Sequence, residues 1–408
     1  MTKGAPDPDA ERLRRLKLDL FLANPHARLA FAPCADPLVS ILVLNYNRAD
    51  QLLECLQSIA ANTGDVSYEL LLADNASTDR APDVLRRVDG ATVLPFDTNL
   101  GFVRGNNEAA RHARGRYLVL LNNDTVVAPG WLSALVRTVE MWPRCGAVGP
   151  KFLFFDGRLQ EAGAILWADA RVNAVGQGAD PNADEFAHVR EVDLVSGACL
   201  LLRTQLYRDL GGLDDRYAPA YFEDVDLCFA VRERGLTVVY QPASVVFHHG
   251  PAPTSVAKTL DLCAANRAKF VARWGAQLKG HVARGYRGEL SGAWDRRAGP
   301  RVLLADRTSS PAAEELAAGG TVVTFVPLGE PALDPARCFA LRQTGVEVRS
   351  GGMTTLAALA RSRVGGYDAA LMGEVPDAGA VCELLSCWLP ATPLHRDRAA
   401  LTSSRRAA

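Results

Sequence analysis

Three short apolar segments of the chain each end abruptly in polar side chains, and this pattern constrains the fold more than any other feature of the sequence. Residues 39–44 lead into Asn45-Tyr46-Asn47, residues 68–73 lead into Asp74, and residues 117–121 lead into Asn122-Asn123-Asp124. Largely apolar runs of this length are typical of strands that are buried on both faces, as in parallel sheets. We therefore expect each polar group to lie at the carboxyl end of a buried strand.

Helical patterns separate these segments. Leu52, Leu56 and Ile59 recur on one helical face after the first segment, and a helical pattern around Ala109 and Ala113 precedes the third. This alternation predicts a mostly parallel sheet with right-handed crossover helices. The carboxyl ends of parallel strands share one edge, which is where open α/β sheets bind ligands.

Asp124 is a carboxylate that follows two neutral amides at that edge. One such carboxylate suits a divalent cation held against a diphosphate, which indicates an enzyme that uses a nucleotide sugar. Asn and Asp are also common turn formers, so a purely structural polar turn is the alternative. This segment alone does not decide between the two interpretations.

The composition is that of an ordinary globular protein. The chain has 408 residues, 48% of them hydrophobic and 22% charged, with a formal net charge of −1, so we expect two or three domains and no nucleic-acid partner. The polar start does not resemble a secretory signal, and no stretch approaches the roughly 20 apolar residues of a membrane span. Nine cysteines without a Cys-x-x-Cys pair predict neither a disulfide framework nor a zinc site. These features predict a cytoplasmic protein.

The sequence predicts four parts. Residues 1–37 form an amphipathic leader, which we expect to dock on the protein body, with a membrane surface as the alternative. Residues 38–296 hold the α/β pattern described above, and a second strand and helix alternation predicts a smaller Rossmann-like α/β domain over residues 299–393. No Gly-x-Gly-x-x-Gly follows Asp306, so we expect this domain to bind or dock rather than catalyse. Residues 394–408 are predicted to be a disordered tail.

Four ordered blocks together resemble the family 2 glycosyltransferases, especially the rhamnosyl- and galactofuranosyltransferase-like branch. The blocks are residues 41–47, 73–79, 99–107 and 120–125, and the resemblance continues through residues 196–198, 211–214, 221–227, His248 and residues 266–270. It extends over about residues 38–280. The resemblance implies a GT-A fold with a mostly parallel sheet flanked by helices, a divalent metal, and a single inverting displacement at the anomeric carbon.

The resemblance also implies a metal site. Asp124 matches the last residue of the family's Asp-x-Asp element, and Asn122 stands where the first acidic residue would be. A second protein ligand is therefore needed, and His248 matches the family's metal-contacting histidine, with His249 as its rival. Oxygen and imidazole ligands together favour Mn²⁺ somewhat over Mg²⁺, and either ion could serve.

Asp224 matches the general base of the family. An ionised carboxylate can take the proton from an acceptor hydroxyl as that oxygen attacks the sugar, while a metal stabilises the departing nucleoside diphosphate. Asp224 lies in the acidic run Glu223-Asp224-Val225-Asp226 at the start of a predicted helix, where carboxylates also act as caps. For Glu223 and Asp226 we expect capping.

The nucleotide is expected to meet the polar ends of the strands. Asp74 can bind the base, although an Asx-turn is the alternative and the two roles can coexist. Gly101 and Gly105 would let the backbone approach phosphate or ribose, whereas Arg104 is either a phosphate ligand or a surface charge. The full predicted set is Asn45, Tyr46, Asn47, Asp74, Asn99, Gly101, Asn106 and Asn123. Residues 156–190 show little pattern and are expected to be an acceptor-contacting loop or a plain connection.

The sequence therefore predicts a metal-dependent, inverting glycosyltransferase that moves a sugar from a UDP- or dTDP-sugar. The acceptor, a hydroxyl of a bacterial-type surface glycan or of its lipid-linked precursor, is implied by the resemblance alone. Two alternatives remain open: a nucleotidyltransferase, which would release pyrophosphate, and a catalytically degenerate glycan-binding scaffold, which Asn122 makes conceivable. Location at the inner face of the membrane, with peripheral association, is also left open.

Overall fold

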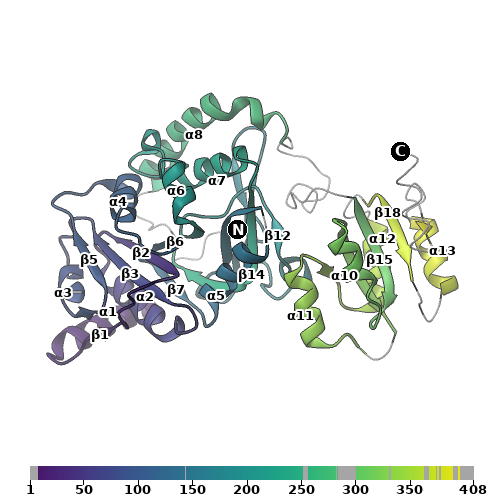
Figure 1. Cartoon of the computed structure of the whole chain (residues 1–408), viewed down its shortest axis with the longest axis horizontal. Helices are drawn as coiled ribbons and strands as arrows, with labels where there is room; N and C mark the ends of the chain where they lie inside the picture. Colours follow the sequence, from purple (N-terminus) through teal and green to yellow (C-terminus); the bar gives the residue numbers. More distant parts are fainter. Residues whose placement is uncertain are drawn as a thin grey trace. The chain divides into compact units, whose positions relative to one another are not determined.

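The chain forms two compact units. The computed structural model describes residues 8–142, 144–250, 256–281, 283, 300–329, 332–362, 367–373, 375, 378–388 and 394–395. The first unit comprises Met1–Gly178 and Asp193–His281, and the second comprises Ala179–Val192 and Val282–Ala408 (Figure 1). The second unit is thus discontinuous in sequence, whereas the predicted division ran continuously across residues 38–296 and 299–393.

Apolar burial explains this difference from the predicted division. Phe186 and Val189 lie in the segment Ala179–Val192 and are buried. The backbone N–H of Val189 donates to the carbonyl of Arg342 at 3.0 Å, and a carboxylate oxygen of Asp184 accepts from the backbone N–H of Ser350 at 2.7 Å. The segment therefore packs with residues that follow it by more than a hundred positions.

The main sheet of the first unit has its strands in the order β5, β3, β2, β6, β13, β8 and β14. Their bounds are β5 (Thr92–Pro95), β3 (Tyr68–Asp74), β2 (Val39–Asn45), β6 (Tyr117–Asn122), β13 (Cys199–Arg203), β8 (Cys145–Leu153) and β14 (Thr237–His248). All neighbouring pairs are parallel except the two that involve β13. The predicted α/β class with a mostly parallel sheet is therefore confirmed.

The strand register brings the polar strand ends together. Asn45 at the end of β2 pairs with Asp74 at the end of β3, and Leu44 pairs with Asn122 at the end of β6. The three apolar segments are thus adjacent strands, and their polar ends share one edge of the sheet, as the sequence predicted.

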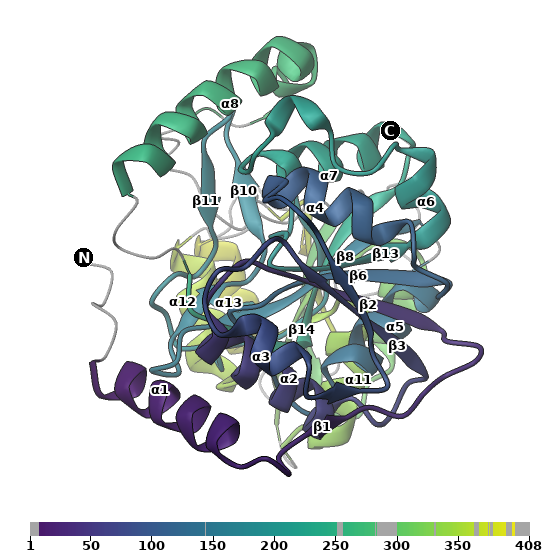
Figure 2. The ribbon, with the colours of Figure 1, turned by 90° about the vertical axis from the view of Figure 1, so that its left-hand side faces the viewer.

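Helices cover both faces of this sheet (Figure 2). The helices α4 (Gly101–Ala110), α6 (Thr204–Asp209), α7 (Glu223–Glu233) and α8 (Val256–Leu278) gather on one side. The helices α2 (Ala49–Asn62), α3 (Ala81–Leu85) and α5 (Trp131–Met141) lie on the other. The indole N–H of Trp131, at the start of α5, donates to the hydroxyl of Thr63 just after α2 at 3.0 Å, so these two helices meet end to end.

Short elements complete the first unit. They are β1 (Leu29–Ala30) with β4 (Val88–Asp89), β7 (Thr125–Val127), β9 (Leu159–Glu161), β10 (Ala164–Leu166) with β11 (Val172–Ala174), and the 3₁₀ turn η2 (Asp215–Tyr217). Two of them matter for the site: β7 pairs with β14, and β9 pairs with β8.

The leader helix α1 (Pro8–Ala23) docks on the first unit, as expected. Arg14 forms an ion pair with Asp50 of α2 at 3.4 Å, and Arg87 donates to the carbonyl of Phe21 at 2.8 Å. The opposite side of α1 leaves three leucines exposed, Leu13, Leu16 and Leu20. Among the helices that the structure describes, none has the length and hydropathy of a membrane-spanning segment.

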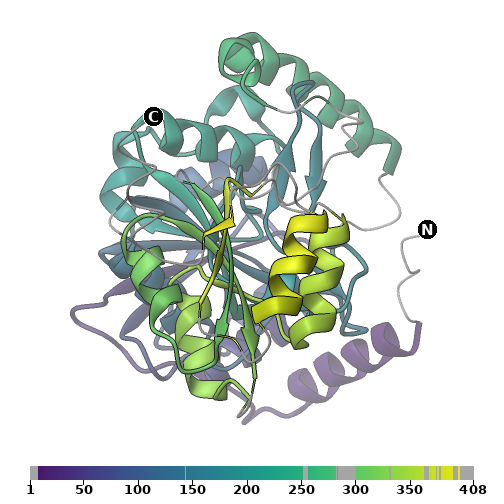
Figure 3. The same ribbon diagram turned by 90° about the vertical axis from the view of Figure 1, so that its right-hand side faces the viewer.

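The second unit contains a five-stranded, fully parallel sheet in the order β17, β16, β15, β18 and β19. The bounds are β15 (Arg301–Arg307), β16 (Val322–Leu328), β17 (Glu347–Val348), β18 (Ala369–Met372) and β19 (Leu394–His395). Helices α10 (Ala312–Ala318) and α11 (Pro335–Gln343) pack on one face, and α12 (Gly352–Ser362) and α13 (Ala378–Trp388) on the other (Figure 3). The segment from the first half of the chain adds the 3₁₀ turn η1 (Asp184–Phe186) and the short strand β12 (Arg190–Glu191).

The predicted α/β alternation of this unit is confirmed, whereas its Rossmann-like kinship stays a prediction. The predicted disordered tail began at Leu394, but Leu394 and His395 form a strand. Residues 396–408 lie outside the described residues.

Candidate active site

Asp124 and His248 lie side by side at the carboxyl edge of the main sheet. Asp124 occupies the turn between β6 and β7, and the pairing of Thr125 with His248 places the end of β14 beside that turn. Nε2 of His248 lies 3.4 Å from Oδ1 of Asp124. Burial would raise the pKa of Asp124, but the neighbouring His248 holds it below the ordinary aspartate value. Burial lowers the pKa of His248, but the charge of Asp124 outweighs it and raises that pKa.

This pair fits part of a divalent cation site. Oδ1 of Asp124 is buried and accepts no hydrogen bond from the described part of the chain. Two ligands about 2.1 Å from one ion at a right angle lie about 3 Å apart, close to the observed separation. The described residues contain no group of three or more His, Cys, Asp or Glu that could hold a metal. Asp124 and His248 would therefore hold a cation together with oxygens from a bound diphosphate.

His249, the rival ligand, faces another partner. Its Nε2 lies 3.4 Å from a carboxylate oxygen of Glu54, and its ring stacks on Phe155 with 3.9 Å between the ring centroids. Only its backbone N–H reaches the turn, donating to the carbonyl of Asp124 at 3.1 Å. The structure therefore brings His248, and not the side chain of His249, to the Asp124 carboxylate.

Asp224 is held at both carboxylate oxygens. The backbone N–H of Gly197 donates to Oδ2 at 3.0 Å, and the N–H of Val225 donates to Oδ1 at 2.8 Å. A Cβ at position 197 would lie 3.2 Å from Cβ of Asp224, so the glycine permits this approach. Burial raises the pKa of Asp224 above the ordinary aspartate value, and the two N–H donors oppose that rise. The carboxylate is thus oriented and more basic than usual.

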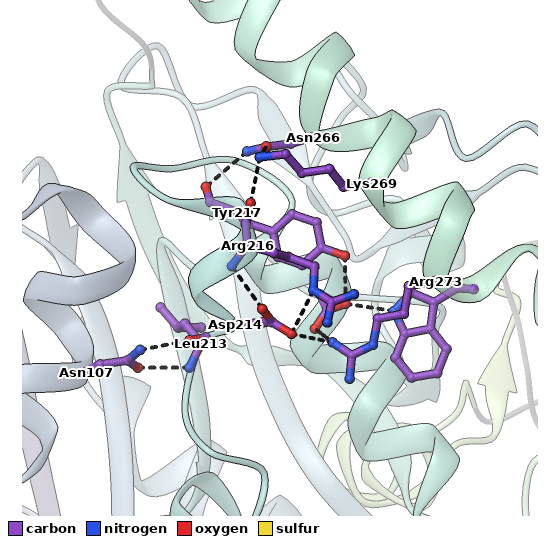
Figure 4. A network of polar contacts seen from close by, with 10 residues as sticks. Asn107, Leu213, Asp214, Arg216, Tyr217, Asn266, Lys269 and Arg273 are labelled. Atoms are coloured by element: carbon purple, nitrogen blue, oxygen red, sulfur yellow. Dashed lines mark hydrogen bonds and ion pairs between the residues drawn. The ribbon is translucent and has the colours of Figure 1, made fainter.

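The turn before Asp224 is strained and braced. Tyr221 and Phe222 have φ values of 75° and 73°, a left-handed conformation that costs free energy for residues with a Cβ. Asn266 of α8 is fully buried, and its amide donates to the carbonyls of Tyr217, Ala220 and Tyr221 at 2.9–3.0 Å. Figure 4 shows Asn266 beside Tyr217. Asn266 therefore holds the backbone that aims Asp224.

Asp226 has a structural role in the same region. Its carboxylate accepts from the hydroxyl of Tyr217 at 2.8 Å, from the indole N–H of Trp274 at 2.7 Å and from Arg273 at 2.8 Å. Arg273 also donates to Asp214 at 2.7 Å (Figure 4). Asp226 thus joins α7 to η2 and α8. The capping that the sequence predicted for it is wrong, because its partners come from other elements.

Glu223 begins α7, and its carboxylate interacts with the backbone N–H groups of Tyr221 and Glu223, so its capping role stays a prediction. Its side chain is buried, and Oε2 finds no hydrogen-bond partner in the part of the chain that the structure describes. Burial, with the neighbouring Asp224 charge, raises the pKa of Glu223 well above the ordinary glutamate value.

Glu161 of β9 belongs to the site and was missed from the sequence. Burial and the charge of Asp224 together raise its pKa to about 7, although a backbone hydrogen bond from Ser196 and the charge of His248 lower it. These interactions put Glu161 within electrostatic reach of both the base candidate and the metal-ligand candidate. Glu161 lies in the loop of residues 156–190 that showed little pattern, and an acid next to the apolar run 162–167 was the one available signal.

Several predicted nucleotide residues form one polar network at the ends of β2 and β6. Asn123 donates to Oδ1 of Asn45 at 2.7 Å, and Asn45 donates to the hydroxyl of Ser77 at 3.0 Å. Oδ1 of Asn47 accepts from the backbone N–H of Thr78 at 2.8 Å. This network fixes the edge on which a nucleotide would lie.

Tyr46 and Asp74 lie at the same edge. The Tyr46 side chain is 46% exposed, which leaves a ring face free for stacking. Oδ1 of Asp74 accepts from the backbone N–H of Ser77 at 3.3 Å, so the Asx-turn alternative is present. This contact leaves Oδ2 of Asp74 for another donor.

Residues 99–106 include the start of α4, and their contacts differ from the nucleotide contacts that the sequence predicted. A Cβ on Gly101 would lie 2.7 Å from Cβ of Pro219, and the carbonyl of Pro219 accepts the N–H of Phe102 at 2.7 Å. The first N–H groups of α4 are thus already bonded, and the sequence-based reason for Gly101, backbone access to phosphate, is wrong. Asn99 accepts the N–H of Gly101 at 2.8 Å, and Asn106 is buried with its amide on the carbonyl of Phe102 at 2.9 Å. These contacts account for Asn99 and Asn106 without a nucleotide.

Gly105 and Arg104 also have local explanations. A Cβ on Gly105 would lie 2.8 Å from a methyl group of Leu44, so this glycine allows α4 to pack on β2. Arg104 forms an exposed ion pair with Asp215 at 3.1 Å, in agreement with the surface-charge alternative. Arg104 thus lines a pocket beside α4, and Gly105 lies where α4 packs on β2. Both places differ from the Asp124 turn.

A pocket of about 790 Å³ lies between α4, α6, α7 and α8, and its lining includes neither Asp124, His248 nor Asp224. Two of its arginines, Arg104 and Arg273, are paired with acids that also line it. These two arginines are thus already paired, and the pocket is separate from the candidate site.

Part of the chain is similar to known proteins. Residues 40–183 match the model of glycosyl transferase family 2. The chain is 34% identical to the O-antigen biosynthesis protein RfbC of Myxococcus xanthus over 55% of this chain, but it spans only 18% of that protein. It is 28% identical to the N-acetylglucosaminyl-diphospho-decaprenol L-rhamnosyltransferase of Mycobacterium tuberculosis, over 57% of this chain and 82% of that protein.

Among solved structures, a crystal structure of GalNAc-T7 with UDP, GalNAc and Mn²⁺ is similar, with 13% sequence identity and a TM-score of 0.49. The similarity covers 68% of this chain and 59% of that one.

Proposed function

We propose that the chain is a metal-dependent, inverting glycosyltransferase, because residues 40–183 match the model of glycosyl transferase family 2. It moves a sugar from a UDP- or dTDP-sugar to a hydroxyl of a surface glycan or of a lipid-linked saccharide precursor. One observation carries the proposal: the buried Oδ1 of Asp124 accepts no hydrogen bond from the described residues and lies 3.4 Å from Nε2 of His248. A carboxylate left in that state is most simply explained by a cation that arrives with the donor.

The proposed reaction assigns one role to each side chain. Asp224 takes the proton as the acceptor oxygen attacks the anomeric carbon, and the bond from that carbon to the diphosphate oxygen breaks. The N–H groups of Gly197 and Val225 hold the Asp224 carboxylate in place for this transfer. When bound, the metal offsets the negative charge that grows on the departing diphosphate. A single displacement of this kind inverts the anomeric configuration.

The acceptor proposal is supported by the named relatives. The Mycobacterium relative is named for a substrate that carries a decaprenol diphosphate, and the Myxococcus relative is named for O-antigen biosynthesis. A lipid-linked acceptor would place the reaction at the cytoplasmic face of a membrane. The exposed Leu13, Leu16 and Leu20 of α1 offer an apolar surface for peripheral association there.

The test is a panel of UDP- and dTDP-sugars with a diphospholipid saccharide acceptor, assayed for nucleoside diphosphate with Mn²⁺, with Mg²⁺ and with a chelator. We expect metal-dependent release of nucleoside diphosphate and, by proton NMR, a product of inverted anomeric configuration. Release of pyrophosphate would instead identify a nucleotidyltransferase. Saccharide binding without turnover of any donor would identify a degenerate scaffold.

A further inference from the structure

Gln160 is an extra residue in the pairing between β9 and β8. In this antiparallel pair Leu159 lies opposite Leu153 and Glu161 lies opposite Phe152, so two steps along β9 match one step along β8. This is a β-bulge with Gln160 unpaired. Bulges are frequent beside active sites, where they turn a side chain toward a place that a regular strand would not reach.

The bulge places the Gln160 amide on His248 at two points. Oε1 of Gln160 lies 3.0 Å from Nδ1 of the His248 ring, and Nε2 of Gln160 donates to the His248 carbonyl at 3.2 Å. The carbonyl can only accept, so the amide nitrogen must be the atom that faces it. The amide oxygen therefore faces Nδ1, and a hydrogen bond at that position requires a proton on Nδ1.

A neutral histidine with its proton on Nδ1 has its lone pair on Nε2. Nε2 is the ring atom that faces Oδ1 of Asp124 at 3.4 Å. When the ring is neutral, two electron-pair donors at this distance repel unless a positive charge, either a proton on Nε2 or a metal cation, lies between them. The Gln160 amide thus orients the His248 ring so that its Nε2 lone pair and Oδ1 of Asp124 can bind one cation without rearrangement.

The geometry points to Gln160 as a positioning residue that fixes the His248 tautomer and so sets the affinity for a divalent cation bound with a nucleoside diphosphate. The cation part of this inference rests on the proposed function. Removal of the hydrogen-bond partner behind a metal-binding histidine typically lowers metal affinity 10- to 100-fold.

Three variants separate this role from simple packing. Gln160→Leu removes both amide contacts, whereas Gln160→Glu keeps an acceptor for Nδ1 and loses the donor to the carbonyl. Gln205→Leu is the matched control, because Gln205 is exposed and its amide bonds only Asp209 among the contacts described, at 2.8 Å. Circular dichroism establishes that each full-length variant is folded before it is measured.

The first readout is the His248 tautomer in metal-free protein, from long-range ¹H–¹⁵N correlation spectra at a pH where the ring is neutral. We expect a protonated Nδ1 in the wild-type protein, in Gln205→Leu and in Gln160→Glu, and a mixture or the other tautomer in Gln160→Leu. A protonated Nε2 in the wild-type protein would overturn the inference, as would an unchanged tautomer in Gln160→Leu. This readout needs neither metal nor turnover, so it decides the role of Gln160 even if the proposed function fails.

The second readout is the affinity for Mn²⁺ in the presence of UDP or dTDP, from electron paramagnetic resonance titration. Gln160→Leu should bind Mn²⁺ about 10- to 100-fold more weakly than the wild type, with Gln205→Leu unchanged. Equal Mn²⁺ affinity in Gln160→Leu and the wild type would contradict the inference. A wild-type protein that binds no Mn²⁺ with either diphosphate would refute the metal dependence in the proposed function, and this is seen before any variant is compared.

Discussion

Oδ1 of Asp124 lies 3.4 Å from Nε2 of His248, although Asp124 lies in the turn after β6 and His248 ends β14, which is not a neighbour of β6 in the sheet. The antiparallel pairing of β7 with β14 makes this contact, because it places the turn after β6 against the last residue of β14.

Asp124→Ala should abolish metal-dependent donor binding and leave the fold intact, because Asp124 is the carboxylate proposed to meet the cation. Calorimetric titration of a UDP- or dTDP-sugar with and without Mn²⁺ measures the effect. His249→Ala is the control and should keep most of the Mn²⁺-dependent affinity, since the His249 ring faces Glu54 and Phe155. Undiminished Mn²⁺-dependent affinity in Asp124→Ala would exclude this ligand assignment.

Asp224→Asn should separate binding from chemistry. The amide oxygen can still accept from Gly197 N–H, but the side chain no longer takes a proton at neutral pH. Transfer should slow by about 10²- to 10⁴-fold with little change in donor affinity, whereas Glu223→Gln should slow it much less. Steady-state rates of sugar transfer by the two variants show which carboxylate is the base. A near wild-type rate in Asp224→Asn with a slow Glu223→Gln would move the base to Glu223.

Glu223→Gln should stabilise the protein at neutral pH by about 1–2 kcal/mol, because folding of the wild type requires the buried Glu223 to take up a proton, whereas glutamine is neutral in both states. Burial raises the folded-state pKa of Glu223, so the folded protein keeps a proton that the unfolded chain loses near pH 4.3. The free energy of unfolding of the wild type should therefore fall as pH rises from about 4.3 through the folded-state pKa. Urea unfolding over this range should show the variant's advantage growing with pH and vanishing in acid. A constant difference between the two proteins would rule out this cause.

Asn266→Ala should destabilise the protein by about 1–3 kcal/mol and lower kcat, because three backbone carbonyls lose their donor and the left-handed turn before Asp224 loses its brace. Val271→Ala is a milder control further along α8, since the Val271 side chain is 41% exposed. Urea unfolding and initial rates measure the two effects. A normal kcat in folded Asn266→Ala would mean that the turn keeps its shape without the amide.

A protein truncated to residues 1–296 should keep metal-dependent donor hydrolysis, since Asp124, His248 and Asp224 all belong to the first unit. The segment Ala179–Val192 would lose its partners, among them the Arg342 carbonyl, so limited proteolysis should cut within it in the truncated protein but not in the full-length one. Soluble, folded truncated protein without any hydrolysis would show that the second unit contributes to the active site.

The strands and their shared polar edge were predictable, because largely apolar runs with polar ends indicate both the element and its orientation. Asp124, His248 and Asp224 came from the family resemblance, and the structure brings the first two together. Gln160 and Glu161 were not predictable, because a bulge leaves no periodic signal in the sequence. The reasons given for Gly101 and Asp226 failed because their partners, Pro219 and Trp274, are distant in sequence.

The discontinuous second unit has a consequence for synthesis on the ribosome. The segment Ala179–Val192 emerges early, but Arg342, which accepts the N–H of Val189, follows about 150 residues later. At typical elongation rates this is a delay on the order of 10 to 30 s. During that time the apolar Phe186 and Val189 have no final burial site, so the nascent chain offers a transient binding site for chaperones.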